Sequence, residues 1–415
     1  MSTTCILHLF EGYGIELEYM IVDKETLSVL PVTDKILHHI AGEYVSDAEM
    51  GELEWSNELV LHVIELKTNG PAKSILGLEQ NFHNHVQHIN QILAPMHGKL
   101  MPTAMHPWMD PNSEMKLWEH DYSAVYEAYN RIFNCSGHGW ANLQSTHINL
   151  PFADDEEFGK LHAAIRLVLP ILPALAAASP IAESQVKDFA DYRLEVYRNN
   201  QAKIPQIAGQ VIPEQVFTKA EYQAGIFDPL YEAIKPHDPE NIMQEEWLNS
   251  RGAIARFDRN TIEIRVIDIQ ECPKADIAIA VFAVEVIKAL ISEKWSTCEA
   301  QKTLHETPLA DIFLRTVKHG EETTINNAAF LKLFGIEAEE MLAKDLWKHL
   351  FSEVINTEEF AHYHNALNVI LYSGTLSARI KKALGTTTPT RQQLHFVYEE
   401  LCNCLNENRQ FLPDA

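Results

Sequence analysis

Two glutamates stand two positions apart in the segment GIELEY, where Glu16 and Glu18 alternate with Ile15, Leu17 and Tyr19. Residues two apart on a β-strand point to the same face, with side chains roughly 6–7 Å apart. Two carboxylates that close repel each other unless cations lie between or beside them. Mg²⁺ suits such a position because it takes carboxylate, phosphate and water oxygens. A solvated acidic face on an edge strand is the commoner reason for an isolated E-x-E pair, so the metal hypothesis needs support from other segments.

A second acidic segment, GELEWSNELVLHVIELKT, covers residues 51–68. Glu52 and Glu54 repeat the E-x-E spacing, and a surface loop is the simpler interpretation for them. Glu58 and Glu65 are seven positions apart, which places them on opposite faces of an ideal strand. They share a site only if one lies at the strand entrance or a bulge intervenes. Glu65 is the stronger candidate, because an acid in the middle of an apolar strand requires a partner.

Two later segments add an imidazole, an amide and a guanidinium to the set. In STHINLP, His147 and Asn149 fall on one strand face, and in TIEIRVID Glu263 and Arg265 do the same. A lone strand histidine is more often a structural residue than a ligand, and an Arg beside a Glu is often only a salt bridge. If Glu263 binds a metal, however, Arg265 is left free to contact a phosphate with its planar fork.

Other familiar motifs are absent or unconvincing. The sequence has no GxxxxGK[ST] loop and no GxGxxG after a strand, so a glycine-rich phosphate cradle is not expected. No Ser-His-Asp or Cys-His pattern stands out either. The histidines of HNHVQH lack a nearby acid or cysteine that would complete a zinc site, and we expect a helix surface there. The same interpretation applies to two further histidine pairs. These residues are His83, His85, His88, His38, His39, His362 and His364.

The elements that must position the acidic residues alternate between strands and helices. The spacing of Phe82, Val86, Ile89 and Leu93 predicts one face of a helix. Strands separated by long helical insertions predict an α+β fold with a mostly antiparallel sheet. An Asp-Arg-Asn turn at residues 258–260 joins two of the strands. Strand-like alternation occurs at about residues 15–23, 59–68, 145–151 and 253–268.

The chain changes character after about residue 296. Before it lie two apolar stretches, residues 168–182 and 277–291, the first interrupted by prolines and the second by charged residues. Neither reaches the roughly 20 apolar residues that a membrane span needs. We interpret both as buried core helices. After about residue 296, amphipathic helical patterns dominate and no strand alternation stands out. We therefore predict a catalytic domain over residues 1–295 and a helical C-terminal region over residues 296–415.

Charge and cysteine content restrict the partners. The 415 residues include 58 acids and 33 bases, a formal net charge of -25, which disfavours a nucleic-acid partner. The negative net charge still allows the protein to bind a nucleotide, provided that cations accompany the phosphates. The start of the chain lacks a targeting segment, and the six scattered cysteines form no CxxC pair. We expect reduced thiols in a cytoplasmic protein that binds neither nucleic acid nor membrane.

Taken in chain order, the motifs resemble those of a known family. GIELEY, NELVLHVIELKT, MHPWMDP, GHGWANLQSTHINLP, ASPIAES with DYR, and TIEIRVID resemble the type 2 glutamate–cysteine ligases, carboxylate–amine ligases whose catalytic sheet is related to that of glutamine synthetase. The similarity is collinear over about residues 10–290 and covers the C-terminal region poorly. It implies a funnel-shaped antiparallel sheet with flanking helices, in which strand carboxylates hold Mg²⁺ or Mn²⁺ and ATP lies against them.

The resemblance also implies roles for particular residues. Glu263 and Arg265 would be catalytic, and Arg265 would contact the transferring phosphate. Arg193 of the DYR segment would hold a substrate carboxylate. His147, Asn149 and Arg265 would contact the nucleotide, although many members have a second histidine where Asn149 stands. The implied metal ligands are Glu16, Glu18, Glu58, Glu65, Glu263 and His147.

The expected activity is amide formation from a small acid and an amine, with ATP consumed and an acyl phosphate as intermediate. Glutamate and cysteine are the leading pair, which would place the enzyme in glutathione biosynthesis. Phosphoryl transfer without ligation, ligation of another acid and amine, and a non-catalytic nucleotide-binding role are the alternatives. The sequence leaves open the substrates, the number of metals, the oligomeric state and the role of the helical C-terminal region.

Overall fold

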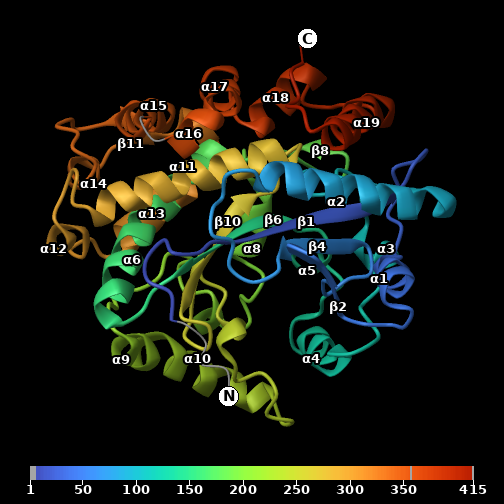
Figure 1. The fold of residues 1–415 in the computed structure, drawn as a ribbon, viewed down its shortest axis with the longest axis horizontal. Helices are drawn as coiled ribbons and strands as arrows, with labels where there is room; N and C mark the ends of the chain where they lie inside the picture. Colours follow the sequence, from blue (N-terminus) through green and yellow to red (C-terminus); the bar gives the residue numbers. More distant parts are fainter. Residues whose placement is uncertain (1–5, 356–357, 414–415) are drawn as a thin grey trace.

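One antiparallel sheet of eight strands forms the centre of the molecule (Figure 1). The computed structural model describes residues 6–355 and 358–413. The strand order is β2-β3-β4-β1-β6-β10-β9, and β5 pairs with the far end of β1 on the side where β6 pairs. The strands are β1 (Gly14–Asp23), β2 (Asp47–Met50), β3 (Leu53–Asn57), β4 (Val63–Thr68), β5 (Gly98–Met101), β6 (Ser145–Pro151), β9 (Ala253–Arg256) and β10 (Thr261–Asp268).

Apolar side chains on one face of the sheet are covered by long helices. Ile15, Leu17 and Tyr19 of β1 have no solvent exposure and belong to the main hydrophobic core. Figure 1 shows α2 (Leu78–Leu93) and α11 (Pro273–Ile291) lying along this face. Because α11 is apolar nearly all round, it is buried by the sheet below and by the C-terminal helices above.

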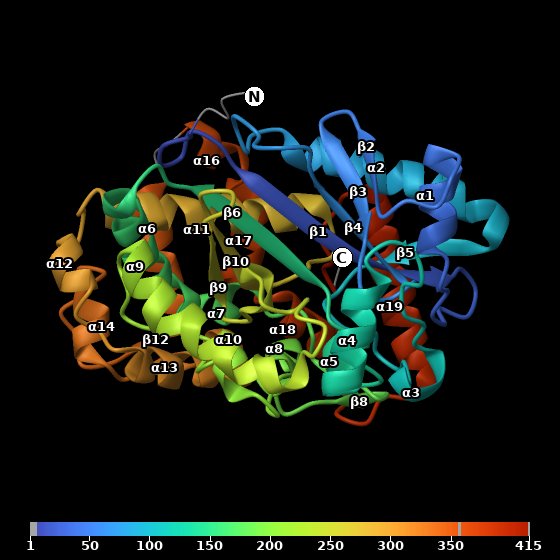
Figure 2. The same ribbon diagram turned by 90° about the horizontal axis from the view of Figure 1, so that it is seen from below.

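The other face of the sheet carries the alternate, polar residues. Shorter helices lie beside the middle strands on this side rather than across them (Figure 2). The short elements of this part are α1 (Thr33–Ala41), α3 (Pro111–Glu114), α4 (Ser123–Phe133), α5 (His138–Ala141), α8 (Tyr192–Tyr197), α9 (Lys219–Tyr222), α10 (Asp228–Ile234), and the 3₁₀ turn η6 (Glu246–Leu248).

The periodic segments fold as predicted, with two corrections. The structure confirms the strands at 145–151 and 253–268 and the turn between β9 and β10. It also confirms the buried apolar face predicted for α2. The strand expected from residue 59 begins only at Val63, so Glu58 lies in a loop. Residues 168–182 are buried but do not form one helix, because three prolines interrupt the backbone hydrogen bonding. They divide into the end of α6 (Asp155–Val168), η2 (Leu169–Ile171), α7 (Pro173–Ala176) and β7 (Ile181–Ala182), which pairs with β8 (Gln185–Val186).

The histidine-rich part of α2 is also corrected in one respect. His83 is buried, with 8% exposure, rather than on the helix surface. His85 accepts a hydrogen bond of 2.9 Å from the indole Nε1 of Trp55. Within the described residues, none of these histidines belongs to a group of three donors close enough to bind one metal.

The C-terminal region is helical, as predicted, apart from one pair of strands. Each of these strands has two residues, which is too short to show an alternation of apolar and polar residues. The region packs directly on the rest of the chain: Trp347 donates a hydrogen bond to the carbonyl of Ile171 and lies edge-on against Phe282. The boundary at residue 295 stays a prediction. The elements are α12 (Cys298–Gln301), α13 (Glu306–His319), β11 (Thr324–Ile325), α14 (Ala328–Lys332), β12 (Met341–Leu342), α15 (Ala343–Val354), α16 (Glu358–His362), α17 (His364–Ser373), α18 (Leu376–Leu384) and α19 (Arg391–Glu407).

No helix within residues 6–355 and 358–413 combines the length and the apolar composition that crossing a bilayer requires.

The histidine of the MHPWMDP segment ties that segment to the core by hydrogen bonds. His106 is fully buried, and its Nε2 donates to the carbonyl of Leu27 while Nδ1 accepts from the backbone N–H groups of Trp108 and Met109. Only the neutral imidazole can make all three bonds. Burial lowers the pKa of His106 to about 3.

This histidine predicts an acid-sensitive stability. Because its folded pKa lies below the unfolded value, its contribution is complete above about pH 6.5 and is lost as the pH falls toward 3. Between pH 7.5 and 5.0 the loss is about 2 kcal/mol. Urea unfolding at both pH values measures this loss. His106→Asn should have a lower free energy of unfolding than the wild type at pH 7.5. The difference between its free energies of unfolding at pH 7.5 and pH 5.0 should be about 2 kcal/mol smaller than that of the wild type. An unchanged pH difference would contradict the assignment, and His39→Asn, at an exposed position of α1, is the matched control.

Candidate active site

Strand register gathers the predicted acidic residues on the polar face of the sheet. Glu16 of β1 lies opposite His147 of β6, and Glu18 lies opposite Glu65 of β4. On the next strand, Glu263 of β10 lies opposite Asn149 of β6. Since directly paired residues share a face, four strands contribute to one site.

His147 lies at the centre of the carboxylates. Its Nδ1 is 2.8 Å from Oε2 of Glu16 and 3.8 Å from Oε1 of Glu263, and its Nε2 is 3.8 Å from Oε1 of Glu18. Within the described residues, two groups of possible metal ligands lie on this face. In each group three ligand atoms lie within 4.8 Å of one another. The groups are Glu16, His147 and Glu263, and Glu18, Glu65 and His147.

Neighbouring hydroxyl and ammonium groups hold the carboxylates in place. The backbone N–H and Oγ of Ser145 both donate to Oε2 of Glu18, at 2.7 and 3.1 Å. Oγ of Ser56 donates to Oε2 of Glu65 at 2.6 Å, and Nζ of Lys67 lies 3.3 Å from the same oxygen. We had not singled out these residues from the sequence, although Ser145 and Lys67 stand two positions from His147 and Glu65 and so share their faces.

The electrostatics show how strongly the acids are crowded. Burial and, after it, the carboxylate of Glu16 raise the pKa of Glu65 to about 7. Burial alone would raise the pKa of Glu16, but the hydrogen bond and charge of His147 together with the charge of Lys67 outweigh it and lower the pKa to about 2. Burial would lower the pKa of His147, yet Glu16 and Glu18 raise it to about 9. A protonated imidazole therefore partly balances the carboxylates.

The donor set fits a hard divalent cation. The two groups offer four carboxylates and one imidazole, and neither includes a cysteine. Oxygen-rich sets of this kind suit Mg²⁺ or Mn²⁺, with the imidazole better matched to Mn²⁺. The crowding described above would be relieved by such a cation, because it would supply the positive charge that one imidazolium provides only in part.

Glu58 reaches the site from the loop between β3 and β4. Burial raises its pKa well above the ordinary value, and the charges of Glu18 and Glu65 add to the effect. It lines the same cavity as Glu18 and His147 but belongs to neither three-donor group. Its role as a metal ligand stays a prediction.

A β-bulge in β10 sets the position of Arg265. The register shifts between Ile264 and Ile267, so Arg265 and Val266 together lie opposite His147. Nε of Arg265 is 2.8 Å from Oε1 of Glu263.

The bulge also turns Asp268 to the polar face, opposite Ser145. Strict alternation from Glu263 would have placed Asp268 on the apolar face, so sequence periodicity could not reveal it.

Two of the predicted binding residues are engaged with the protein itself. Nε of the buried Arg193 is 2.5 Å from Oδ1 of Asp268, and Nδ2 of Asn149 donates to Oε1 of Glu16 at 2.8 Å. Arg193 also lines the larger cavity. Contacts of Arg193 with a substrate and of Asn149 with a nucleotide stay predictions.

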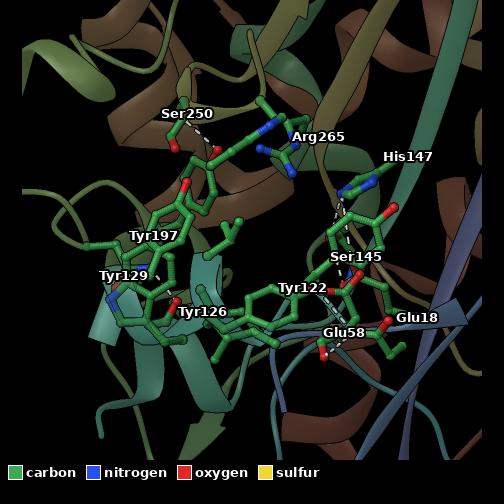
Figure 3. A pocket seen from close by; sticks show the side chains of 18 of the residues that line it. Glu18, Glu58, Tyr122, Tyr126, Tyr129, Ser145, His147, Tyr197, Ser250 and Arg265 are labelled. Atoms are coloured by element: carbon green, nitrogen blue, oxygen red, sulfur yellow. Dashed lines mark hydrogen bonds and ion pairs between the residues drawn. The ribbon is translucent and has the colours of Figure 1, made fainter. Parts of the chain in front are cut away.

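We call the group of Glu16, Glu18, Glu65 and Glu263 around His147 the acidic strip. Cavities lie on both sides of it. The larger, of about 750 Å³, is lined by Glu18, Glu58, His147 and Arg265 together with several aromatic residues (Figure 3). The second, of about 590 Å³, is lined by Glu16, Lys67, Asn149 and Arg259 among others. The aromatic residues are Tyr122, Tyr126, Tyr129, Trp140, Tyr197 and Trp247. Tyr122, Tyr126 and Tyr129 follow the i, i+4, i+7 spacing of one helix face at α4. Trp140, Tyr197 and Trp247 come from three other elements, so their meeting with the tyrosines could not be predicted from spacing.

Comparison with known proteins places the chain in a family. Residues 13–400 match the family described as glutamate–cysteine ligase family 2 (GCS2). The chain belongs to this family. The match includes most of the C-terminal region, which corrects the expectation that the similarity ends near residue 290.

Individual relatives agree with this placement. The chain is 34% identical over 400 residues to an uncharacterized protein of Archaeoglobus fulgidus, covering 96% of this chain and 100% of that protein. It is 24% identical over 295 residues to the "Putative glutamate–cysteine ligase 2-1" of Nocardioides sp., covering 68% and 69%. The crystal structure of the glutamate–cysteine ligase of Francisella tularensis in complex with AMP has the same fold, with a TM-score of 0.58 and 13% identity, over 94% of this chain and 88% of that one.

Glu16→Gln should weaken Mn²⁺ binding by about tenfold or more, because even partners of metal ligands contribute that much. Electron paramagnetic resonance of free Mn²⁺ measures the affinity, and circular dichroism checks that the variant is folded. The matched control is Glu54→Gln, which changes a carboxylate of β3 that pairs with Lys67 outside both donor groups. Equal Mn²⁺ affinity in Glu16→Gln and the wild type would contradict the metal assignment.

Proposed function

We propose that this protein joins a small carboxylic acid to an amine in an ATP-dependent reaction through an acyl phosphate. The observation that carries the proposal is the group of carboxylates around His147, with Arg265 at its edge and a cavity on either side. Membership of the glutamate–cysteine ligase family supports the same reaction class. An ATP site is further supported by the AMP complex of the structurally similar Francisella protein.

The chemistry follows from the charges. A carboxylate oxygen of the acid attacks the γ-phosphorus, the bond to ADP breaks, and an acyl phosphate forms. The amine nitrogen then attacks the acyl carbon, phosphate leaves, and the nitrogen loses a proton to give the amide. Mg²⁺ or Mn²⁺ held by Glu16, Glu18, Glu65, Glu263 and His147 would neutralise phosphate charge and polarise the transferring group.

The side chains of this chain account for positioning. The guanidinium of Arg265 is held by Glu263 beside the strip, where it can stabilise charge on the phosphoryl oxygens. Arg193, fixed by Asp268, can pair with a carboxylate of the acid. Catalysis then depends on orientation and electrostatics, and no protein nucleophile is needed.

The family name and the names of two relatives support glutamate as the acid and cysteine as the amine. This finer assignment, with its place in glutathione biosynthesis, rests on those names. A cytoplasmic location is proposed on the cysteines: the five in the described residues are all free thiols, and Cys5 lies outside the described residues.

The reaction is tested by ADP release with Mg²⁺-ATP and L-glutamate, with and without an amine, starting with L-cysteine. Release that requires both partners, with the amide detected by mass spectrometry, is the expected result. Glu263→Gln should abolish it while the protein stays folded. Release that needs no amine would indicate phosphoryl transfer instead, and full activity in Glu263→Gln would contradict the role of the strip.

Arg265→Lys should lower kcat by about 100-fold, because a single ammonium does not replace a bidentate guanidinium aimed at developing charge. Steady-state ADP release at saturating substrates measures this, and metal affinity should change little. The matched control is Arg198→Lys, a partly exposed arginine of the surface that pairs with Glu195. A kcat within twofold of the wild type would exclude a transition-state role for Arg265.

A further inference from the structure

The larger cavity has two chemically different ends (Figure 3). Glu18, His147 and Arg265 lie on one side and the ring of Tyr129 lies on the other. Tyr197 lies between them, with its hydroxyl close enough to interact with Arg265. We call the second side the aromatic end and define it by Tyr126, Tyr129, Trp140, Tyr197 and Trp247, which all line the cavity.

The rings of the aromatic end support one another. Ring centroids of Tyr129 and Trp140 are 5.0 Å apart at 52°, and those of Tyr129 and Trp247 are 5.8 Å apart at 45°. Both distances are typical of favourable aromatic pairs. The rings come from α4, α5 and η6, so three separate segments are joined into one wall before any ligand arrives.

Two phenol groups at this end are already hydrogen-bonded. The hydroxyl of Tyr126 accepts from Nδ2 of Asn57 at 3.1 Å, and that of Tyr197 donates to the carbonyl of Ser250 at 2.9 Å. With these polar tips engaged, the tyrosines offer chiefly ring surface to the cavity. A ligand that fills this end therefore gains more from flat apolar contact than from hydrogen bonds to the phenols.

Charge separates the two substrates along the cavity. Arg265 and Arg193 lie toward the acidic strip and favour the anionic acid. Glu245, which is the N-cap residue of the turn that carries Trp247, also lines the cavity and, within the described residues, pairs with no basic side chain. Carboxylates together with ring faces attract an ammonium group, so the aromatic end suits the amine.

Cysteine would leave most of this end unfilled, because its side chain is one methylene and a thiol. A cavity of about 750 Å³ is of the size that holds much larger ligands. We propose that the amine substrate is a primary amine carrying a benzene, phenol or indole ring, which packs against Tyr129, Trp140 and Trp247. This inference rests on the proposed ligase function for the reaction and on the cavity for the amine.

Binding is tested by isothermal titration of tryptamine, butylamine and L-cysteine into the wild-type protein without ATP. Tryptamine should bind at least about tenfold more tightly than the other two, because only it places a ring against the wall. Trp140→Ala and Trp247→Leu should each weaken tryptamine binding about fivefold and change butylamine binding less than twofold. Phe396→Ala, an exposed aromatic residue of α19, is the matched control and should change neither.

Turnover is tested by ADP release with L-glutamate and each amine. Aromatic amines should show a kcat/KM at least about tenfold above that of cysteine, and Trp140→Ala should raise their KM. Equal binding of tryptamine and butylamine, a turnover preference for cysteine, or a Trp140→Ala effect confined to the KM of ATP would each overturn the inference. If no amine supports ADP release, the ligase proposal fails while the titrations still decide which ligand the aromatic end binds.

Discussion

The crowding of carboxylates around His147 is the constraint on which the rest of the site depends. Glu16, Glu18, Glu65 and Glu263 come from three strands, and each is buried or nearly so on the polar face of the sheet. Like charges at this density are stable only with compensating positive charge. In the protein alone, His147, Lys67 and Arg265 supply part of it. The remaining imbalance is what makes this face a place for divalent cations and the polyphosphate that they accompany.

The sheet can hold such a group because β1 is central and its other face is fully apolar. Pairing on both sides fixes β1, and α2 and α11 bury Ile15 and Leu17 behind the acids. One extra residue in β10 forms a bulge that changes which of the later residues of the strand face the site. The bulge keeps Glu263 on the polar face and brings Asp268 there as well, so that Arg193 and Arg265 both lie at the edge of the strip. A local irregularity thus links the metal ligands to the arginines.

Periodicity was enough to predict the strands at 145–151 and 253–268, the buried stripe of α2 and the α+β class, because each depends on local alternation. It also placed Glu16 with Glu18, and His147 with Asn149, on the same face of their own strands, while the family resemblance, which was confirmed, grouped these residues with Glu263. The bulge that moves Asp268, the loop that carries Glu58 and the meeting of the aromatic residues depend on tertiary contacts. The prolines near residue 170 divide an apolar run that its composition alone predicts to be one helix.

The most direct test of the account is the position of Mn²⁺ in crystals grown with a non-hydrolysable ATP analogue. Anomalous scattering locates the ion independently of activity. The account predicts at least one ion coordinated by His147 and the carboxylates of Glu16 and Glu263, or by His147 with Glu18 and Glu65. Ions found only elsewhere, for example at the separate surface group of Asp34, Glu119 and His120, would contradict it.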